Sequence, residues 1–164
     1  MKSFLSNNFY NKFLLTLCFI VFLFQSEDCL GETILLEKVD LLHSGLSEIN
    51  NKSVNKNNFL FILGIINKTY DAEKMGRMII SQKWKSLPSN DQKEFIDVFE
   101  KFIATNYLKR FSKIKKVNFR IQSITKIKEK FRLVNVLMTV NDDDKIEFGY
   151  LFHLKDNEWF IFDV

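Results

Sequence analysis

Few residues of this chain carry the chemistry that catalysis or metal binding requires. Two are histidines, His43 and His153, and two are cysteines, Cys18 and Cys29. A nucleophile–base pair needs a Ser or Cys beside a His, with a group that orients the His, and neither His lies in such a pattern. Two cysteines are too few for a disulfide scaffold or a clustered zinc site. The sequence therefore predicts no catalytic residue, no metal site and no cofactor.

Two charged clusters could bind an ion or a polar partner. Asp142-Asp143-Asp144 lacks the Gly and the bidentate Glu of a calcium loop, which favours a solvated hairpin turn. A basic stretch with interleaved Phe could contact anionic lipid headgroups, an acidic partner or RNA. Its simpler interpretation is a helix end followed by a solvated strand edge, and a net charge of +4 does not indicate a nucleic-acid partner. The stretch comprises Lys109, Arg110, Phe111, Lys113, Lys115, Lys116, Phe119 and Arg120.

Residues 1–31 have the pattern of a secretory signal peptide. Their apolar segment, residues 13–24, follows two Lys residues and precedes a polar exit. Such a segment rises about 18 Å as a helix, which is too short for a hydrocarbon core of about 30 Å. We expect cleavage before Glu32, which leaves a mature chain, residues 32–164, without cysteine, as suits an oxidising compartment. The alternative is an uncleaved signal anchor.

Helical periodicity dominates the first half of the mature chain. Apolar residues at spacings of three and four predict an amphipathic helix over about 32–49. A second helix begins at Asn57 or Asn58, either of which can cap it, and Asp71 can cap a third.

The clearest helix start in the sequence lies at Ser89. Gln92 follows it by three residues, which is the spacing of a capping box. The helix that begins here carries one broad apolar stripe, formed by Phe95, Phe99, Phe102, Ile103, Tyr107 and Phe111.

After Lys116 the hydrophobic period changes to two, which is typical of strands. Turn residues at 141–144 and 155–158 separate the last three runs, so we expect an antiparallel meander. Helices followed by strands predict an α+β domain, with the N-terminal helices packed on one face of a twisted antiparallel sheet. The alternating runs cover about 117–122, 133–140, 146–154 and 159–163.

Large, soft apolar side chains are abundant on the predicted faces. Of the 18 Phe, twelve lie in residues 59–162. They could fill a core, or they could line a pocket between the sheet and its helices. Composition alone does not distinguish a packed core from a lined pocket.

One run of residues has a specific order and spacing. It is Tyr70-Asp71-x3-Met75-x3-Ile79-x4-Trp84, then Ser89-x2-Gln92-x2-Phe95-x3-Phe99-x7-Tyr107. A Val134-x-Val136 strand and a Trp159-x3-Asp163-Val164 ending follow. Together they resemble the MlaC family of periplasmic phospholipid-binding proteins, also known as toluene-tolerance auxiliary components of an ABC lipid transporter. The resemblance spans about residues 33–164.

The resemblance implies a monomeric periplasmic lipid carrier of a Gram-negative bacterium, with a hydrophobic cavity between helices and sheet and no enzymatic activity. Such a carrier shuttles phospholipid between an outer-membrane lipoprotein complex and an inner-membrane ABC transporter, and so maintains outer-membrane lipid asymmetry. Carried over by position, the lipid-binding residues on the helices are Met75, Ile79, Phe95, Phe99, Phe102 and Tyr107. Those on the sheet are Val134, Val136, Met138, Phe148, Tyr150 and Phe152.

This chain departs from the family pattern in two places. It has Ile80-Ser81 where the family usually has Leu-Gly, so the end of that helix should differ. The family also continues past the position of Val164 into C-terminal helices, so we expect the phospholipid-binding domain, residues 32–164, to lack that segment.

Two alternatives come from other functional classes. One is a small enzyme or ligand binder resembling nuclear transport factor 2, whose only candidate acid–base pair is His153 with Glu147 or Asp163. His153 has the opposite strand parity to Phe152 and should point away from a cavity, which disfavours this alternative. The other is a membrane-anchored interaction protein, which requires a retained leader.

Overall fold

The computed structural model describes residues 31–164, in which one compact unit ends at Leu36 and a second comprises residues 37–164. The predicted signal peptide, apart from Gly31, lies outside the described residues. Residues 31–48 are helical, which agrees with the periodicity over 32–49. Within the described chain, all other helices and strands belong to residues 37–164.

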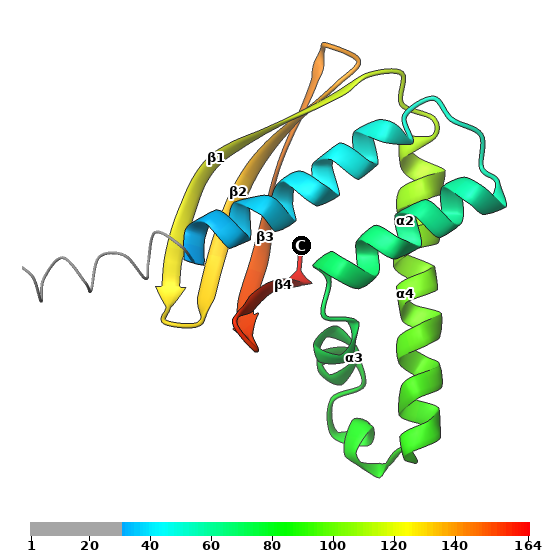
Figure 1. Ribbon diagram of the computed structural model, residues 1–164, viewed down its shortest axis with the longest axis vertical. Helices are drawn as coiled ribbons and strands as arrows, with labels where there is room; N and C mark the ends of the chain where they lie inside the picture. Colours follow the sequence, from blue (N-terminus) through cyan, green and yellow to red (C-terminus); the bar gives the residue numbers. More distant parts are fainter. Residues whose placement is uncertain (1–30) are drawn as a thin grey trace, which may run out of the picture. The chain divides into compact units, whose positions relative to one another are not determined.

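Three α-helices and one 3-10 helix follow the first helix. α2 and α3 both pack on α4, and α2 crosses α4 in Figure 1. The first helix approaches α2 at Gly45, where an added Cβ atom would overlap the buried side chain of Ile65. Glycine therefore lets these two helices pack closely. The elements are α2 (Lys56–Thr69), α3 (Ala72–Ile80), η1 (Ser81–Ser86) and α4 (Ser89–Phe111).

Side-chain caps define the starts of α2 and α3. Asp71 caps α3 as predicted, because its carboxylate accepts a hydrogen bond from the Lys74 N–H at 2.8 Å. The cap of α2 is Asn55, not Asn57 or Asn58. Its Oδ1 accepts from the Asn58 N–H at 2.9 Å, so the helix begins earlier than expected.

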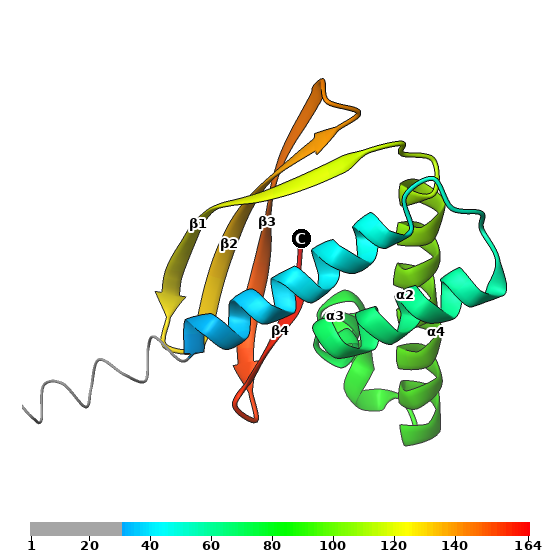
Figure 2. The ribbon, with the colours of Figure 1, turned by 45° about the horizontal axis from the view of Figure 1, so that its top comes forward.

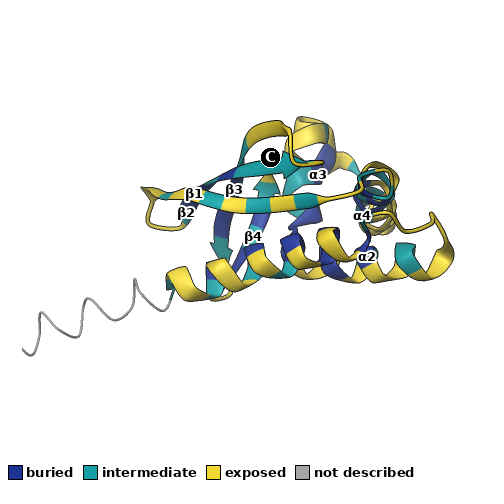
Figure 3. Ribbon diagram, turned by 90° about the horizontal axis from the view of Figure 1, so that it is seen from above, coloured by how far each residue is buried: buried dark blue, intermediate teal, exposed yellow. Residues whose placement is uncertain are grey.

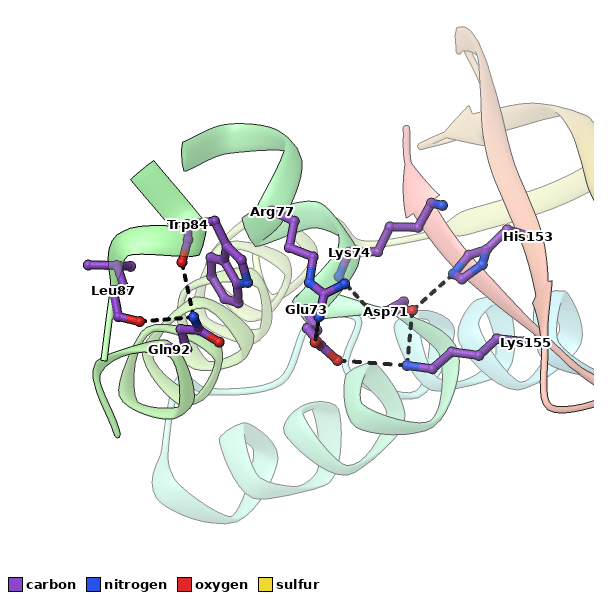
Figure 4. Close-up of polar contacts among 9 residues, drawn as sticks. All are labelled: Asp71, Glu73, Lys74, Arg77, Trp84, Leu87, Gln92, His153 and Lys155. Carbon is purple, nitrogen blue, oxygen red and sulfur yellow. Dashed lines mark hydrogen bonds and ion pairs between the residues drawn. The ribbon is translucent and has the colours of Figure 1, made fainter. Parts of the chain in front are cut away.

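The predicted capping box at the start of α4 is wrong. Pro88 is the N-cap residue, so Ser89 already lies inside the helix and makes no side-chain cap. Gln92 reaches back past the helix start, where its amide donates to the carbonyls of Trp84 and Leu87, both at 3.0 Å (Figure 4). The side chain thereby ties α4 to η1.

The strands form one open antiparallel sheet in the order β1-β2-β3-β4, which confirms the predicted meander and the α+β class (Figures 1 and 2). Asp156 and Asn157, with φ of 51° and 64°, form the two-residue turn between the last two strands. This left-handed conformation matches the twist of paired strands, which explains the tight hairpin. The strands are β1 (Val117–Lys128), β2 (Phe131–Val140), β3 (Asp144–Lys155) and β4 (Glu158–Asp163).

Residues 37–48 of the first helix lie over one face of the sheet. The His43 ring stacks on Phe119 of β1, with ring centroids 4.1 Å apart. Pairing of Val134 with Tyr150, and of Val136 with Phe148, puts alternate residues of β2 and β3 on this same face. Buried positions concentrate between helix and strands, whereas the outward side of the helices is exposed (Figure 3).

α3 reaches the other face of the sheet. The Lys74 ammonium lies 5.3 Å from the ring centroid of Phe131 and 4.8 Å from that of Phe162. Phe131 pairs with His153, whose side chain points away from the face that carries Phe152, as predicted from strand parity.

Candidate functional site

An apolar pocket of about 440 Å³ opens between the end of α4 and the sheet face covered by residues 37–48. Four of the predicted lipid-binding residues line it, namely Tyr107, Met138, Phe148 and Tyr150. Met138 lies on β2 and Phe148 on the neighbouring β3. Along each strand, the side chains alternate between the two faces of the sheet, and these two lie on the pocket face. Ligand pockets in proteins have volumes of about 300–1,000 Å³, so this space is large enough for a small organic group or an alkyl chain.

Three predicted sheet residues lie deeper on the same face. Val134, Val136 and Phe152 are each 0% exposed and do not line the pocket. They form part of the packed core of the domain, whose close packing supports the pocket wall.

The five remaining predicted residues lie on α3 and α4 away from the pocket. The rings of Phe95, Phe99 and Phe102 stack successively along α4, with centroids 5.7 and 6.3 Å apart. Phe102 is 60% exposed and Ile79 62%, and Met75 is half-buried on α3. The structure therefore separates these α3 and α4 residues from the four that line the pocket.

The pocket also contains residues outside the twelve predicted lipid-binding positions. Ile114, in the loop after α4, carries no periodic signal, whereas Phe119 and Val140 had the strand alternation that could have identified them. Arg110, Asp144 and Val164 complete the rim. The additional apolar residues are Leu46, Phe111, Ile114, Phe119, Val140 and Ile146.

The hydroxyl groups near the pocket already have protein partners. The Tyr107 and Tyr70 hydroxyls share a hydrogen bond of 2.5 Å, and the Tyr150 hydroxyl lies 3.3 Å from His43 Nε2. Burial raises the pKa of Tyr70, Tyr107 and Tyr150. These phenols therefore stay neutral, and the interior of the pocket offers apolar contact rather than free hydrogen-bonding groups.

His43 is neutral in this environment. Burial lowers the pKa of its imidazole to about 4, and the negative charge of Asp40 offsets this only in part. A neutral ring can accept the hydrogen bond of the Tyr150 hydroxyl while it stacks on Phe119. His43 thus holds two walls of the pocket, Tyr150 and Phe119, in place and has a structural role.

A second, polar cluster lies at the start of α3 (Figure 4). His153 Nε2 and the Lys155 ammonium approach the Asp71 carboxylate at 3.0 and 3.4 Å. Asp71 is therefore the carboxylate partner of His153, in place of Glu147 or Asp163, the candidates in the disfavoured enzyme alternative. The sequence could not indicate this contact, because Asp71 and His153 are 82 residues apart.

The charges of this cluster are mutually compensated. Burial by itself would raise the pKa of Asp71, but the Lys74 N–H, the charge of Lys155 and, at the acidic pH where it is protonated, His153 lower it. Burial and the charge of Lys74 lower the pKa of His153. A carboxylate, a neutral imidazole and an ammonium thus join the start of α3 to β3, with no nucleophilic Ser or Cys among the residues that line this cluster.

Neither a metal centre nor a membrane span is found in the described chain. Among residues 31–164, no three His, Cys, Asp or Glu side chains are grouped closely enough to hold a metal ion. None of the helices in that range has the length and apolar character needed to cross a bilayer.

The comparisons with known proteins agree with this fold. The family model described as MlaC protein matches residues 41–164. The structure is similar to a phospholipid-binding protein from Ralstonia solanacearum in complex with a phospholipid. Their TM-score is 0.62 and their identity 12%, over 81% of this chain and 75% of that chain, which shows a shared fold.

A second solved structure is similar only at a low level. It is described as an NTF2-like transpeptidase from Campylobacter jejuni, with a TM-score of 0.35 and 19% identity over 63% of this chain and 90% of that chain. A TM-score this low carries no argument about fold or function. No curated protein matches the sequence.

Proposed function

The chain belongs to the MlaC family, and on that premise we propose that it binds a phospholipid, with an acyl chain in the apolar pocket and the headgroup at the rim. The acyl chain contacts Tyr107, Met138, Phe148 and Tyr150. Val134, Val136 and Phe152 support them from the core. The phospholipid in the similar Ralstonia solanacearum structure supports this proposal.

The observation that carries the proposal is an open apolar pocket whose internal polar groups are already paired. The Tyr107 and Tyr150 hydroxyls bond to Tyr70 and His43, so an alkyl chain leaves no buried polar group unsatisfied. Inside the pocket, below the rim, a polar substrate would find few free hydrogen-bonding groups. The pocket therefore favours binding of a long apolar group over chemistry on a polar one.

The volume of the pocket suits one acyl chain. A water-sized group takes about 30 Å³, so about 440 Å³ accommodates about 15 such groups, close to the carbon atoms of one chain. Each buried CH₂ contributes about 0.8 kcal/mol, so one chain contributes on the order of 12 kcal/mol of gross hydrophobic free energy. A carrier with such a lining offsets much of the free energy needed to take a lipid out of a bilayer.

In the cell, the protein is an exported periplasmic carrier without catalytic activity. It exchanges lipid with docked partners, because release of an acyl chain into water is too unfavourable for a free intermediate. An inner-membrane ABC transporter complex and an outer-membrane lipoprotein complex are the partners that family membership favours.

Lipid content of the purified protein tests the proposal. The full chain is expressed in a Gram-negative host, and the purified product is analysed by native mass spectrometry and lipid extraction. We expect about one phospholipid per chain. Val140→Trp, which fills the pocket, should lower the load several-fold, whereas Val54→Trp at a 58% exposed position should not. Folded wild-type protein that is lipid-free and takes no lipid from vesicles would refute the proposal.

A second pair of variants tests which predicted residues bind lipid. Met138→Asp places a charge in the pocket, and Phe99→Asp places the same charge on the α4 stripe. We expect only Met138→Asp to lower the lipid load of protein that remains folded by circular dichroism. A loss with Phe99→Asp alone would move the binding site to the α3 and α4 residues.

A further inference from the structure

Two opposite charges lie at the rim of the otherwise apolar pocket. Arg110 comes from the last turn of α4 and Asp144 from the first position of β3, and both line the pocket. They are the two pocket-lining residues with ionisable side chains of fixed charge at neutral pH. The inference drawn from them rests on the proposed function, because it concerns the headgroup of a lipid held in that pocket.

Arg110 presents an uncompensated guanidinium to the pocket. Its side chain is exposed, and within residues 31–164 it forms no ion pair with any carboxylate. Its positive charge acts on the neighbouring Tyr107, where it opposes the effect of burial on the pKa of the phenol. A guanidinium offers several N–H donors in a planar fork that matches two oxygens of a phosphate.

Asp144 presents an uncompensated carboxylate to the same space. It alternates in phase with Ile146, Phe148 and Tyr150, so its side chain belongs to the pocket face of the sheet. The nearby Lys116 is engaged elsewhere, since its ammonium pairs with Asp142 at 2.7 Å. No cation of the described chain pairs with Asp144, and Asp144 and Arg110 do not pair with each other.

We propose that Arg110 binds the phosphate and Asp144 the cationic end of a zwitterionic phospholipid headgroup, so that this pair sets the headgroup preference of the pocket. An unpaired anion and an unpaired cation on one rim match a headgroup that carries both charges. Asp144 also repels a headgroup whose only charge is negative. The arrangement therefore selects zwitterionic over anionic lipids, although Lys113 and Lys115 after α4 add positive charge nearby.

Competitive uptake from vesicles tests the pair. Lipid-free full-length protein is incubated with vesicles of equal parts phosphatidylethanolamine and phosphatidylglycerol, and the bound lipids are identified after repurification. We expect wild type to take up phosphatidylethanolamine in about tenfold preference. Arg110→Gln should lower the uptake of both lipids several-fold, and Asp144→Asn should remove most of the preference without lowering the total load.

Adjacent residues of the same charge that do not line the pocket supply matched controls. Lys109→Gln and Asp143→Asn should leave both load and preference unchanged. Inorganic phosphate should not displace bound lipid, because the site needs the acyl chain as well as the phosphate. Displacement by phosphate would instead mean that Arg110 belongs to a free-anion site.

The possible failures are distinguishable. If Arg110→Gln and Asp144→Asn behave like the control variants Lys109→Gln and Asp143→Asn while the protein still carries lipid, the headgroup assignment is wrong and the proposed function stands. If wild type prefers phosphatidylglycerol, the basic residues rather than Asp144 dominate the rim, and the assignment is also wrong. Wild-type protein that takes up neither lipid would overturn both proposals.

Discussion

The folded protein should lose stability as the pH falls from about 7.5 to about 5, because the fold holds His43 neutral. Burial lowers the pKa of this imidazole from 6.5 to about 4, and Asp40 offsets the effect only in part. In the unfolded chain the same ring binds a proton near pH 6.5. Below that pH the unfolded state binds more protons than the folded state, so acid favours unfolding until the pH passes through the folded pKa.

The two pKa values determine the size of the effect. Between pH about 7.5 and about 5, the linkage relation predicts a loss of about 2 kcal/mol from His43 alone. Near pH 4 the loss approaches about 3 kcal/mol. Small domains are stable by only about 5–15 kcal/mol, so the change should be readily measurable. Protonation also prevents Nε2 from accepting the hydrogen bond of the Tyr150 hydroxyl.

Urea unfolding at the two pH values, followed by the fluorescence of the buried Trp84 and Trp159, measures this loss. His43→Gln is the comparison, because glutamine does not titrate, favours helix and can accept a hydrogen bond from Tyr150. The pH-dependent loss should be about 2 kcal/mol smaller in the variant, while the titrations of His153 and Asp71 are common to both proteins. Equal pH dependence of the two proteins, or an NMR-measured pKa of His43 near 6.5, would refute the reasoning.

Four further predictions concern the helices and the polar cluster. In thermal or urea unfolding, Gly64→Ala should raise the free energy of unfolding by about 1 kcal/mol, because nothing lies within 4 Å of the added Cβ. Gly76→Ala should lower it by about 1–3 kcal/mol, because its Cβ would lie 2.6 Å from Cε1 of Phe95. Ser81→Gly should stabilise by about 1 kcal/mol, since Ser81 has a φ of 53°, and an equal or lower melting temperature would contradict this. Asp71→Asn keeps the helix cap but removes the carboxylate from His153 and Lys155, so it should destabilise at pH 7 by about 1–3 kcal/mol. Because the pKa of Asp71 is lowered in the fold, this difference should diminish as the pH falls below 3.8 and through the folded value, and a difference independent of pH would contradict the assignment.

Much of the fold was predictable from local patterns. The alternation of β2 and β3 placed Val134, Val136, Met138, Phe148, Tyr150 and Phe152 on one face, and the structure confirms that placement through the strand register. Asp71 was recognisable as a helix cap because capping depends on residues only a few positions apart. The capping box at Ser89 failed because the preceding 3-10 helix competes for Gln92, and that contact depends on how the chain turns back after α3.

The sequence by itself determined the order of helices and strands and which side chains share a face, because periods of two and 3.6 are properties of a single element. Only the tertiary structure decided that Phe148 lines a pocket while Phe152 is packed in the core, since that depends on where the helices leave the sheet uncovered. It also decided that Asp71 meets His153, and that Arg110 and Asp144 share one rim. These contacts join residues far apart in the chain, and no local period encodes them.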